Sequence, residues 1–169
     1  VGSSHLISKV YFPRLLIPIA SILTGLVDFV IAFGFLLVLM VFYRVPLSPQ
    51  ILATPIFVAG AMAVAAGAGT LFSALVVSYR DFRYVITFVV QLWLFATPVL
   101  YTLDSVPANW RLLYGLNPMV GMIVGFRTAV LGGVWPSELI VTGFVTASIL
   151  LIVALRYFTT VERRFADVI

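Results

Sequence analysis

The chain has 169 residues, of which 63% are hydrophobic and only 9% are charged, and its formal net charge is +4. Soluble domains carry about 25% charged residues, so this composition excludes a water-soluble globular protein. We expect an all-α, polytopic transmembrane helical bundle, whose net positive charge relates to membrane orientation and lipid headgroups rather than to nucleic acid. The sequence contains no cysteine, which excludes disulfides and thiolate chemistry.

Residues 1–14 are too short and too polar to cross a bilayer. Leu6 and Val10 are four residues apart, which predicts a short amphipathic helix, and Pro13 ends it. Two interpretations fit this segment equally well: a helix that lies on the headgroups, or a docking element for a partner protein.

Four apolar segments follow, and each is predicted to cross a hydrocarbon core of about 30 Å. They cover residues 15–43, 51–77, 84–101 and 139–158, and a charged tail occupies 159–169. The third segment begins after the charged motif Arg80-Asp81-Phe82-Arg83 and reaches Thr97-Pro98, where proline favours the end of a helix or a kink.

Two of these spans carry further signals. Asp28 lies near the middle of the first span, where a carboxylate has to face protein or water; it is either a hydrogen-bonded packing residue or a polar group on a transport path. In the second span, Ala59, Ala63 and Gly67 form a row of small residues spaced by four. Such rows let helix backbones approach closely, so we expect a tight helix-packing face here.

Four spans would place both chain ends on the same side of the membrane. Seven of the ten basic residues would share that side, namely Lys9, Arg14, Arg80, Arg83, Arg156, Arg163 and Arg164. Arg44, Arg111 and Arg127 would lie on the other side. Because cytoplasmic loops are enriched in lysine and arginine, we expect both ends to be cytoplasmic.

Residues 104–134 are too few and too interrupted for two more spans. A short helix is predicted from Trp110 to Tyr114, and a second begins at Asn117 as N-cap with Pro118 in the first helical position. Gly121 and Gly125 mark an edge of close approach on this second helix, which ends at Gly132-Gly133. The pattern indicates a re-entrant or interfacial helix pair on the outer face, which acts either as a structural cap or as a gate over an exit path.

We find no pattern of catalytic residues. Lys9, the sole lysine, follows no glycine-rich loop, so the chain has no Walker-type phosphate-binding motif. His5 is the sole histidine and has no second ligand residue for a metal. We therefore expect no catalytic residue, no metal site and no cofactor bound by this chain.

Several motifs occur in one order along the whole chain: Lys9-Val10-Tyr11-Phe12-Pro13-Arg14, Gly25-Leu26-Val27-Asp28-Phe29, Tyr79-Arg80-Asp81-Phe82, Gln91-Leu92-Trp93-Leu94-Phe95, Leu116-Asn117-Pro118-Met119 and Glu162-Arg163-Arg164-Phe165-Ala166-Asp167. In this order they resemble the membrane (permease) subunit of type-2 ABC exporters, in the branch that exports polysaccharide and lipopolysaccharide O-antigen. Permeases of that family have six spans, so the resemblance implies that an amino-terminal part with the first two is missing. Those spans are either lost by fragmentation or supplied by another chain.

The resemblance implies roles for two groups of residues. Coupling to a separate ATPase subunit would involve His5, Lys9, Tyr11, Arg14, Arg80 and Asp81. The substrate path and outer gate would involve Asp28, Gln91, Trp93, Phe95, Tyr101, Trp110, Tyr114 and Arg127. The aromatic members would stack on sugar rings, although tryptophan and tyrosine at span ends are also ordinary interfacial residues.

The resemblance also implies partners and a location. The partners would be an ABC ATPase subunit that binds ATP and Mg²⁺, a second permease copy, membrane lipids and a glycan or glycolipid substrate such as O-antigen, capsule or a teichoic-acid-like polymer. The location would be the bacterial inner membrane, with several passes. Two alternatives remain at this point: a type-2 exporter of a small molecule or drug, and a non-transporting membrane scaffold. An intramembrane lipid-modifying enzyme would need paired acidic residues or a histidine cluster, which the sequence lacks.

Overall fold

The computed structural model describes residues 16–79 and 81–166. Its elements in chain order are α2 (Leu16–Phe42), the 3-10 helix η1 (Pro49–Ala53), α3 (Thr54–Ser78), α4 (Phe82–Phe95), the 3-10 helix η2 (Leu103–Ser105), α5 (Ala108–Gly115), α6 (Pro118–Leu131) and α7 (Ser137–Ala166). The described residues form helices and no strand, so the predicted all-α class is confirmed.

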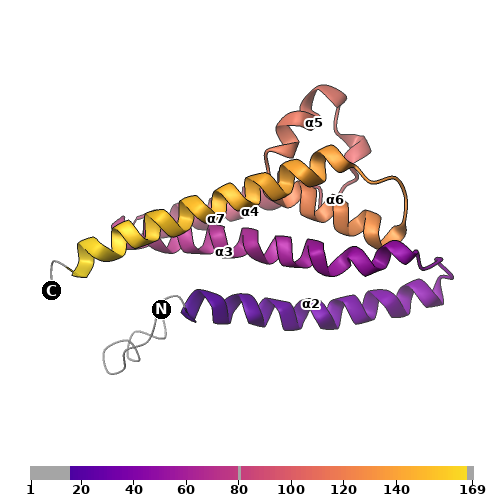
Figure 1. Ribbon diagram of the computed structural model, residues 1–169, viewed down its shortest axis with the longest axis horizontal. Helices are drawn as coiled ribbons and strands as arrows, with labels where there is room; N and C mark the ends of the chain where they lie inside the picture. The colour runs from indigo at the N-terminus through magenta and orange to yellow at the C-terminus, as the bar shows by residue number, and fades with distance from the viewer. Residues whose placement is uncertain (1–15, 80, 167–169) are drawn as a thin grey trace.

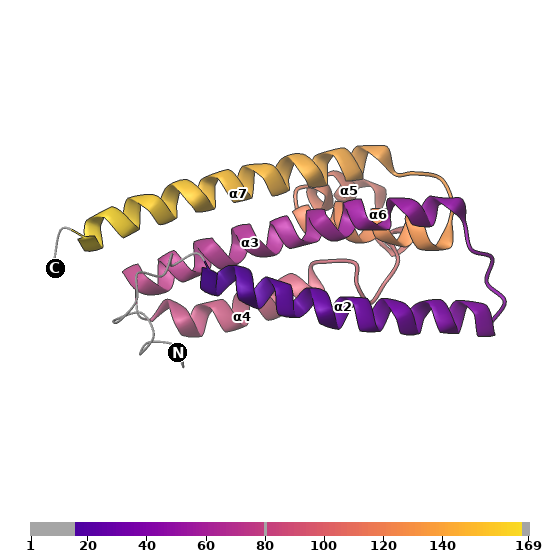
Figure 2. The same cartoon turned by 60° about the horizontal axis from the view of Figure 1, so that its bottom comes forward.

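The long helices α2, α3 and α7 run alongside one another, and the short helices α5 and α6 lie towards one end of the bundle (Figure 1). A view turned by 60° shows the same arrangement: the start of α2, the end of α3 and the end of α7 lie at the opposite end (Figure 2). The short helix pair and the described chain ends are therefore separated by the length of the bundle.

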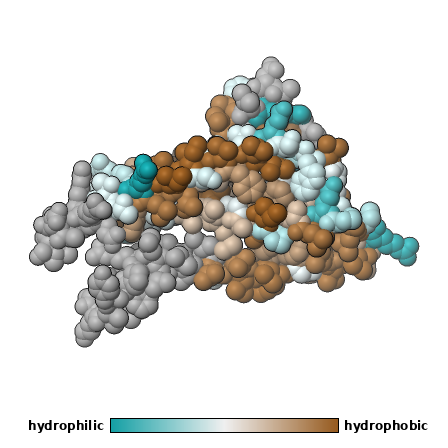
Figure 3. Space-filling view, in the orientation of Figure 1, coloured by the Kyte–Doolittle hydropathy of each residue, from teal (hydrophilic) through white to brown (hydrophobic). Residues whose placement is uncertain are grey.

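Among the described residues, three helices are long and apolar enough to cross a membrane, over Leu23–Phe42, Pro49–Ser78 and Ser137–Val161. Figure 3 shows hydrophobic surface over the middle of the face in view, with hydrophilic patches towards its ends. Many large apolar side chains of these helices are exposed, for example Val30, Phe35 and Ile152. Because lipid tails can cover such a surface and water cannot without cost, the fold is that of a helical membrane bundle.

The predicted span at 84–101 is not one continuous helix. α4 has 14 residues and ends at Phe95, which corresponds to about 21 Å at 1.5 Å per residue. The reason is Pro98, which has no N–H to donate to the Leu94 carbonyl and disfavours a helical conformation at Thr97. α4 is thus shorter than the hydrocarbon core of about 30 Å, and the chain from Ala96 to Tyr101 continues without a regular helix.

The last predicted span and the start of the charged tail lie on one helix. α7 continues for 30 residues from Ser137 to Ala166, so the helix extends into the 159–169 segment, and the boundary of the span stays a prediction. No proline or glycine occurs between Phe158 and Ala166 to end the helix earlier.

Small residues set the closest helix contacts. The buried face of α3 includes Gly60, Val64 and Gly67, and a Cβ atom added to Gly67 would lie 3.2 Å from the Leu151 backbone on α7. Gly67 and, from the neighbouring row of small residues, Thr70 and Ala74 are buried, whereas Ala59 is exposed. The packing face therefore uses small residues of both rows together with larger ones such as Phe57.

The predicted features of α6 are confirmed. Asn117 is its N-cap and accepts a hydrogen bond from the Met119 backbone N–H at 3.1 Å. Gly121 packs against Gly143 of α7: a Cβ atom on Gly121 would lie 2.9 Å from the Gly143 Cα and would also collide with the Leu139 carbonyl oxygen. The helix ends at Gly132, whose φ of 79° and ψ of 176° favour glycine. This packing holds α6 against α7.

Candidate functional site

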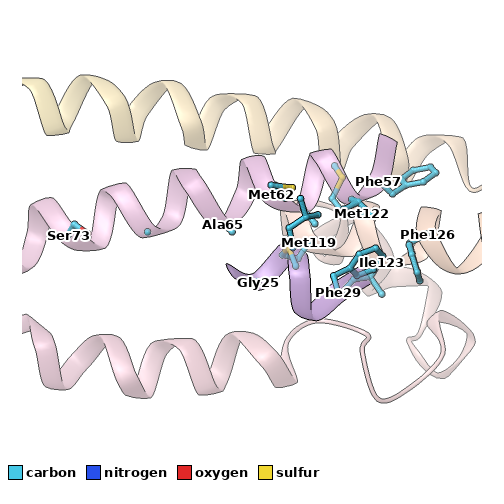
Figure 4. A pocket seen from close by; sticks show the side chains of 14 residues that line it. Gly25, Phe29, Phe57, Met62, Ala65, Ser73, Met119, Met122, Ile123 and Phe126 are labelled. Atoms are coloured by element: carbon cyan, nitrogen blue, oxygen red, sulfur yellow. The ribbon is translucent and has the colours of Figure 1, made fainter. Parts of the chain in front are cut away.

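An apolar trough lies on the surface of α3 and α6, between α2 and α4. Its first part is a cavity of about 680 Å³ between α2, α3 and α6, and Figure 4 shows the side chains of these helices around it. Its second part, of about 370 Å³, lies between α3, α4 and α6. The two parts adjoin, because both are lined by Ala65, Gly69, Met119 and Ile123.

The walls of the apolar trough are almost entirely hydrophobic. The first part is lined by phenylalanine and methionine side chains, among them Phe29, Met62 and Phe126, and Ser73 supplies its one hydroxyl group. Gly69 leaves the surface of α3 bare, since a Cβ atom there would meet nothing within 4 Å. Such walls suit apolar chains and the faces of flat rings, and they offer few groups for directional polar recognition.

Asn117 joins the carboxyl end of α4 to the start of α6. Its side-chain oxygen accepts a hydrogen bond from the Trp93 indole N–H at 2.9 Å, and its amide N–H group donates to the Thr97 hydroxyl at 3.0 Å and to the Ala96 carbonyl at 3.4 Å. The Thr97 hydroxyl in turn donates to the Trp93 carbonyl at 2.7 Å. One side chain thus caps α6 and bonds to three residues at the end of α4.

Arg127 binds the segment that follows this junction. Its guanidinium donates to the carbonyl oxygens of Tyr101 at 3.1 Å, Pro98 at 3.3 Å and Val99 at 3.3 Å. Backbone outside a helix has carbonyls without partners, and the five donors of a guanidinium can serve several at once. Arg127 therefore replaces the hydrogen bonds that the chain loses where α4 ends.

Tyr101 and Tyr114 form the third link between the segment after α4 and the short helices. Their hydroxyl groups are 2.6 Å apart, and Tyr101 lies beyond the end of α4, outside the three long apolar helices. Partial burial, and then the hydrogen bond with Tyr114, raise the pKa of Tyr101 to about 12. The Tyr101 phenol is therefore neutral at physiological pH.

The structure brings together four of the eight predicted path and gate residues: Trp93, Tyr101, Tyr114 and Arg127 surround the segment after α4. Of these, Trp93 also lines the apolar trough. The other four have exposed side chains, namely Asp28, Gln91, Phe95 and Trp110. Phe95 meets the group only through its backbone carbonyl, which accepts a hydrogen bond from the Tyr101 hydroxyl at 3.1 Å. Asp28 lies on the exposed surface of α2, so neither of its two interpretations is decided and both stay predictions.

Most of the predicted ATPase-coupling residues lie outside the described residues: His5, Lys9, Tyr11, Arg14 and Arg80. Asp81 is described, and it is exposed immediately before α4, where its side chain makes no capping hydrogen bond. This position leaves its carboxylate accessible to a partner, and the coupling role stays a prediction.

Sequence reasoning missed the contacts that Asn117 and Thr97 make with each other and with Trp93. The available signal was the capacity of the amide: an N-cap uses only the oxygen of asparagine, which leaves two N–H donors in an apolar region that need acceptors. The acceptors belong to Ala96 and Thr97, which lie 21 and 20 positions before Asn117 in the sequence, so no local pattern identifies them.

Among the residues that the structure describes, no group of three or more His, Cys, Asp or Glu side chains could hold a metal ion. The described part of the chain offers an apolar trough and a hydrogen-bonded junction at the carboxyl end of α4.

Comparison with known proteins gives the family. Residues 4–131 match the family model described as "ABC-2 type transporter". Two proteins of Klebsiella pneumoniae, each named "O-antigen export system permease protein RfbA", are 26% identical over alignments that cover 100% of this chain. A protein of Myxococcus xanthus with the same name is 29% identical over 72% of this chain and 48% of its own length. The chain spans 66% of the length of the Klebsiella relatives. Since the family model covers well over half of the sequence, this chain belongs to the ABC-2 type transporter family.

Proposed function

We propose that this chain is the transmembrane permease subunit of an ATP-driven exporter that moves a polysaccharide or lipid-linked glycan across the bacterial inner membrane. The observation that carries this proposal is the alignment of the entire chain with relatives named as O-antigen export permeases. The apolar trough supports it, because phenylalanine and tryptophan faces can stack on sugar rings and its remaining walls can accept lipid tails.

The chain itself binds no cofactor in this proposal. ATP and Mg²⁺ bind a separate ATPase subunit, and two permease copies form the path between them. ATP drives export only if the ATPase subunits bind it with different affinities in two states of the assembly. Residues 1–14 and the exposed Asp81 transmit the conformational change of the ATPase subunits to the membrane helices. Both ends of this chain are cytoplasmic.

The proposed topology predicts which sites a membrane-impermeant maleimide can reach in intact cells. The chain has no native cysteine, so Trp110→Cys and Asp81→Cys each introduce a single reactive thiol at an exposed position. We expect Trp110→Cys to be labelled in intact cells and Asp81→Cys only after permeabilisation. The reverse pattern would overturn the outer-face assignment of α5.

The transport role predicts a specific effect of filling the apolar trough. Gly69→Phe places a ring in the apolar trough, and a Cβ atom at Gly69 would meet nothing within 4 Å. Gly34→Phe on α2 is the matched control, because a Cβ atom there also meets nothing within 4 Å and Gly34 lies outside the trough. In vesicles that contain the permease with its ATPase, we expect Gly69→Phe to remove most of the ATP-driven glycan flux and Gly34→Phe to retain it.

Two outcomes of this experiment would contradict the proposal. Equal flux for both variants would exclude the apolar trough as the path. ATP-driven efflux of a small hydrophobic drug, with no movement of a lipid-linked glycan, would assign the chain to small-molecule export instead.

A further inference from the structure

Helix α4 makes its polar contacts with α5 and α6 at its carboxyl end, whereas its amino end, called the free end below, is held by the short connection to α3 and by the contact between the Tyr79 and Phe82 rings. None of its 14 residues is buried, and large apolar side chains along it are exposed, among them Tyr84, Phe88 and Leu94. Trp93, one turn from the end, is the residue of α4 that packs against the core cluster, and its ring meets the edge of Phe72 at 6.5 Å between centroids.

The attachment at that end is polar. Seven hydrogen bonds connect the stretch from Trp93 to Tyr101 with α5 and α6: three through the Asn117 side chain, three through the Arg127 guanidinium and one between Tyr101 and Tyr114. Because hydrogen bonds and a short non-helical segment constrain position more than tilt, this end can stay in place while the direction of the helix changes.

The element that carries Asn117 and Arg127 is itself fixed. α6 meets α7 at the backbone contact between Gly121 and Gly143, and it meets α3 where the Phe57 ring lies against Gly125. A Cβ atom on Gly125 would collide with that ring, so α6 has no free space towards α3. The hydrogen bonds therefore attach a weakly packed helix to a tightly packed one.

We propose that Asn117 and Arg127 form a pivot about which α4 tilts, so that movement of its amino end changes the width of the apolar trough while α6 stays in place. The 12 residues from Phe82 to Trp93 give a lever of about 17 Å, and a tilt of about 10° over that length moves the amino end by about 3 Å. The functional role of the pivot rests on the proposed export function, whereas its geometry depends on this chain alone.

Spin-label pairs on cysteine variants of the chain, in lipid nanodiscs without ATPase or substrate, measure the pivot directly. All labelled positions are exposed: Leu100 with Leu116 across the pivot, Val77 with Val85 at the free end of α4, and Leu131 with Val141 between α6 and α7. We expect a broad distance distribution at the free end and narrow distributions for the other two pairs.

Two substitutions separate the pivot from the cap. Asn117→Ser keeps an N-cap hydroxyl for α6 but cannot reach Trp93 or the end of α4. Trp93→Phe removes the indole N–H donor and part of the ring that packs against Phe72. In Asn117→Ser we expect the population with a displaced Leu100–Leu116 distance to rise roughly 150-fold, the factor that matches about 3 kcal/mol for three lost hydrogen bonds. Trp93→Phe should shift it in the same direction by about fivefold, and the Leu131–Val141 distribution should not change in either variant.

Three results would overturn the proposal. A free-end distribution as narrow as that across the pivot would show that α4 does not tilt. An unchanged Leu100–Leu116 distribution in Asn117→Ser would show that Asn117 does not hold α4, and broadening of all three pairs would make it a residue that only stabilises the fold. Because no ATPase or substrate is present, failure of the export assay would not alter any of these readings.

Discussion

Replacing Gly121 with alanine is expected to lower the free energy of unfolding by about 1–3 kcal/mol, the usual range for a group forced into a packed interior. The added Cβ would collide with the Leu139 carbonyl oxygen and would lie 2.9 Å from the Gly143 Cα. Both obstacles are backbone atoms of α7, which cannot turn aside as a flexible side chain can. α6 and α7 would have to separate, and the contacts of buried Val120 and Met122 would weaken with them.

Gly34→Ala is the matched control for this prediction. Gly34 is also inside a helix, yet a Cβ atom there would meet nothing within 4 Å, so alanine should leave stability unchanged or raise it slightly, since glycine is the poorer helix former. The measurement is the thermal unfolding midpoint of the purified chain in detergent micelles. Equal midpoints for Gly121→Ala and Gly34→Ala would show that the contact between α6 and α7 tolerates a methyl group.

Replacing Arg127 with methionine is expected to cost about 2–4 kcal/mol, because three backbone carbonyls lose their charged donor and their location restricts replacement by water. These are the carbonyls of Pro98, Val99 and Tyr101. Methionine preserves the length and apolar stem of the side chain, so the loss is one of hydrogen bonds and not of volume. The segment after α4 should become the least protected part of the described chain in amide hydrogen exchange.

Arg127→Lys tests whether charge alone is sufficient. Lysine retains the positive charge but concentrates its donors on one nitrogen, so it cannot reach all three carbonyls in the way that the planar guanidinium does. We expect its unfolding midpoint and its protection over residues 96–103 to lie between those of the native chain and of Arg127→Met. A lysine variant as stable as the native chain would reduce the role of Arg127 to electrostatics.

The features that could be predicted from the sequence depend on neighbours along the chain. Asn117 and Pro118 mark the start of α6 because capping uses residues two or three positions apart. The end of α6 at Gly132 follows from a backbone conformation that favours glycine, and Gly121 was recognisable as an edge of close approach. In each case the physical cause and the sequence signal lie within one or two helical turns.

The features that could not be predicted depend on residues that meet only after folding. The resemblance to type-2 ABC exporters implied that Trp93 and Arg127 belong to the substrate path and outer gate. In the structure their N–H groups bond to Asn117 and to backbone carbonyls of the same chain. Residue type indicated that these side chains needed partners. Tertiary contacts with residues that lie 24 and 26 positions away in the sequence determined which partners they have. Pro98 did predict a helix end or kink close to the observed end of α4 at Phe95, whereas the predicted span reached Tyr101 because hydropathy continues past Pro98.

The shortness of α4 has a consequence for the lipid around the protein. Helix α4, of about 21 Å, and helix α7, which has 30 residues, match bilayers of two different thicknesses, and mismatch of this kind is relieved by thinning the membrane or by tilting the longer helix. The hydrogen bonds of Arg127 lower the cost of extending α4 with non-helical backbone, whereas its own charge costs about 2.5–3.5 kcal/mol at mid-membrane. The guanidinium therefore belongs at headgroup depth, and it fixes how deeply this side of the protein sits in the membrane.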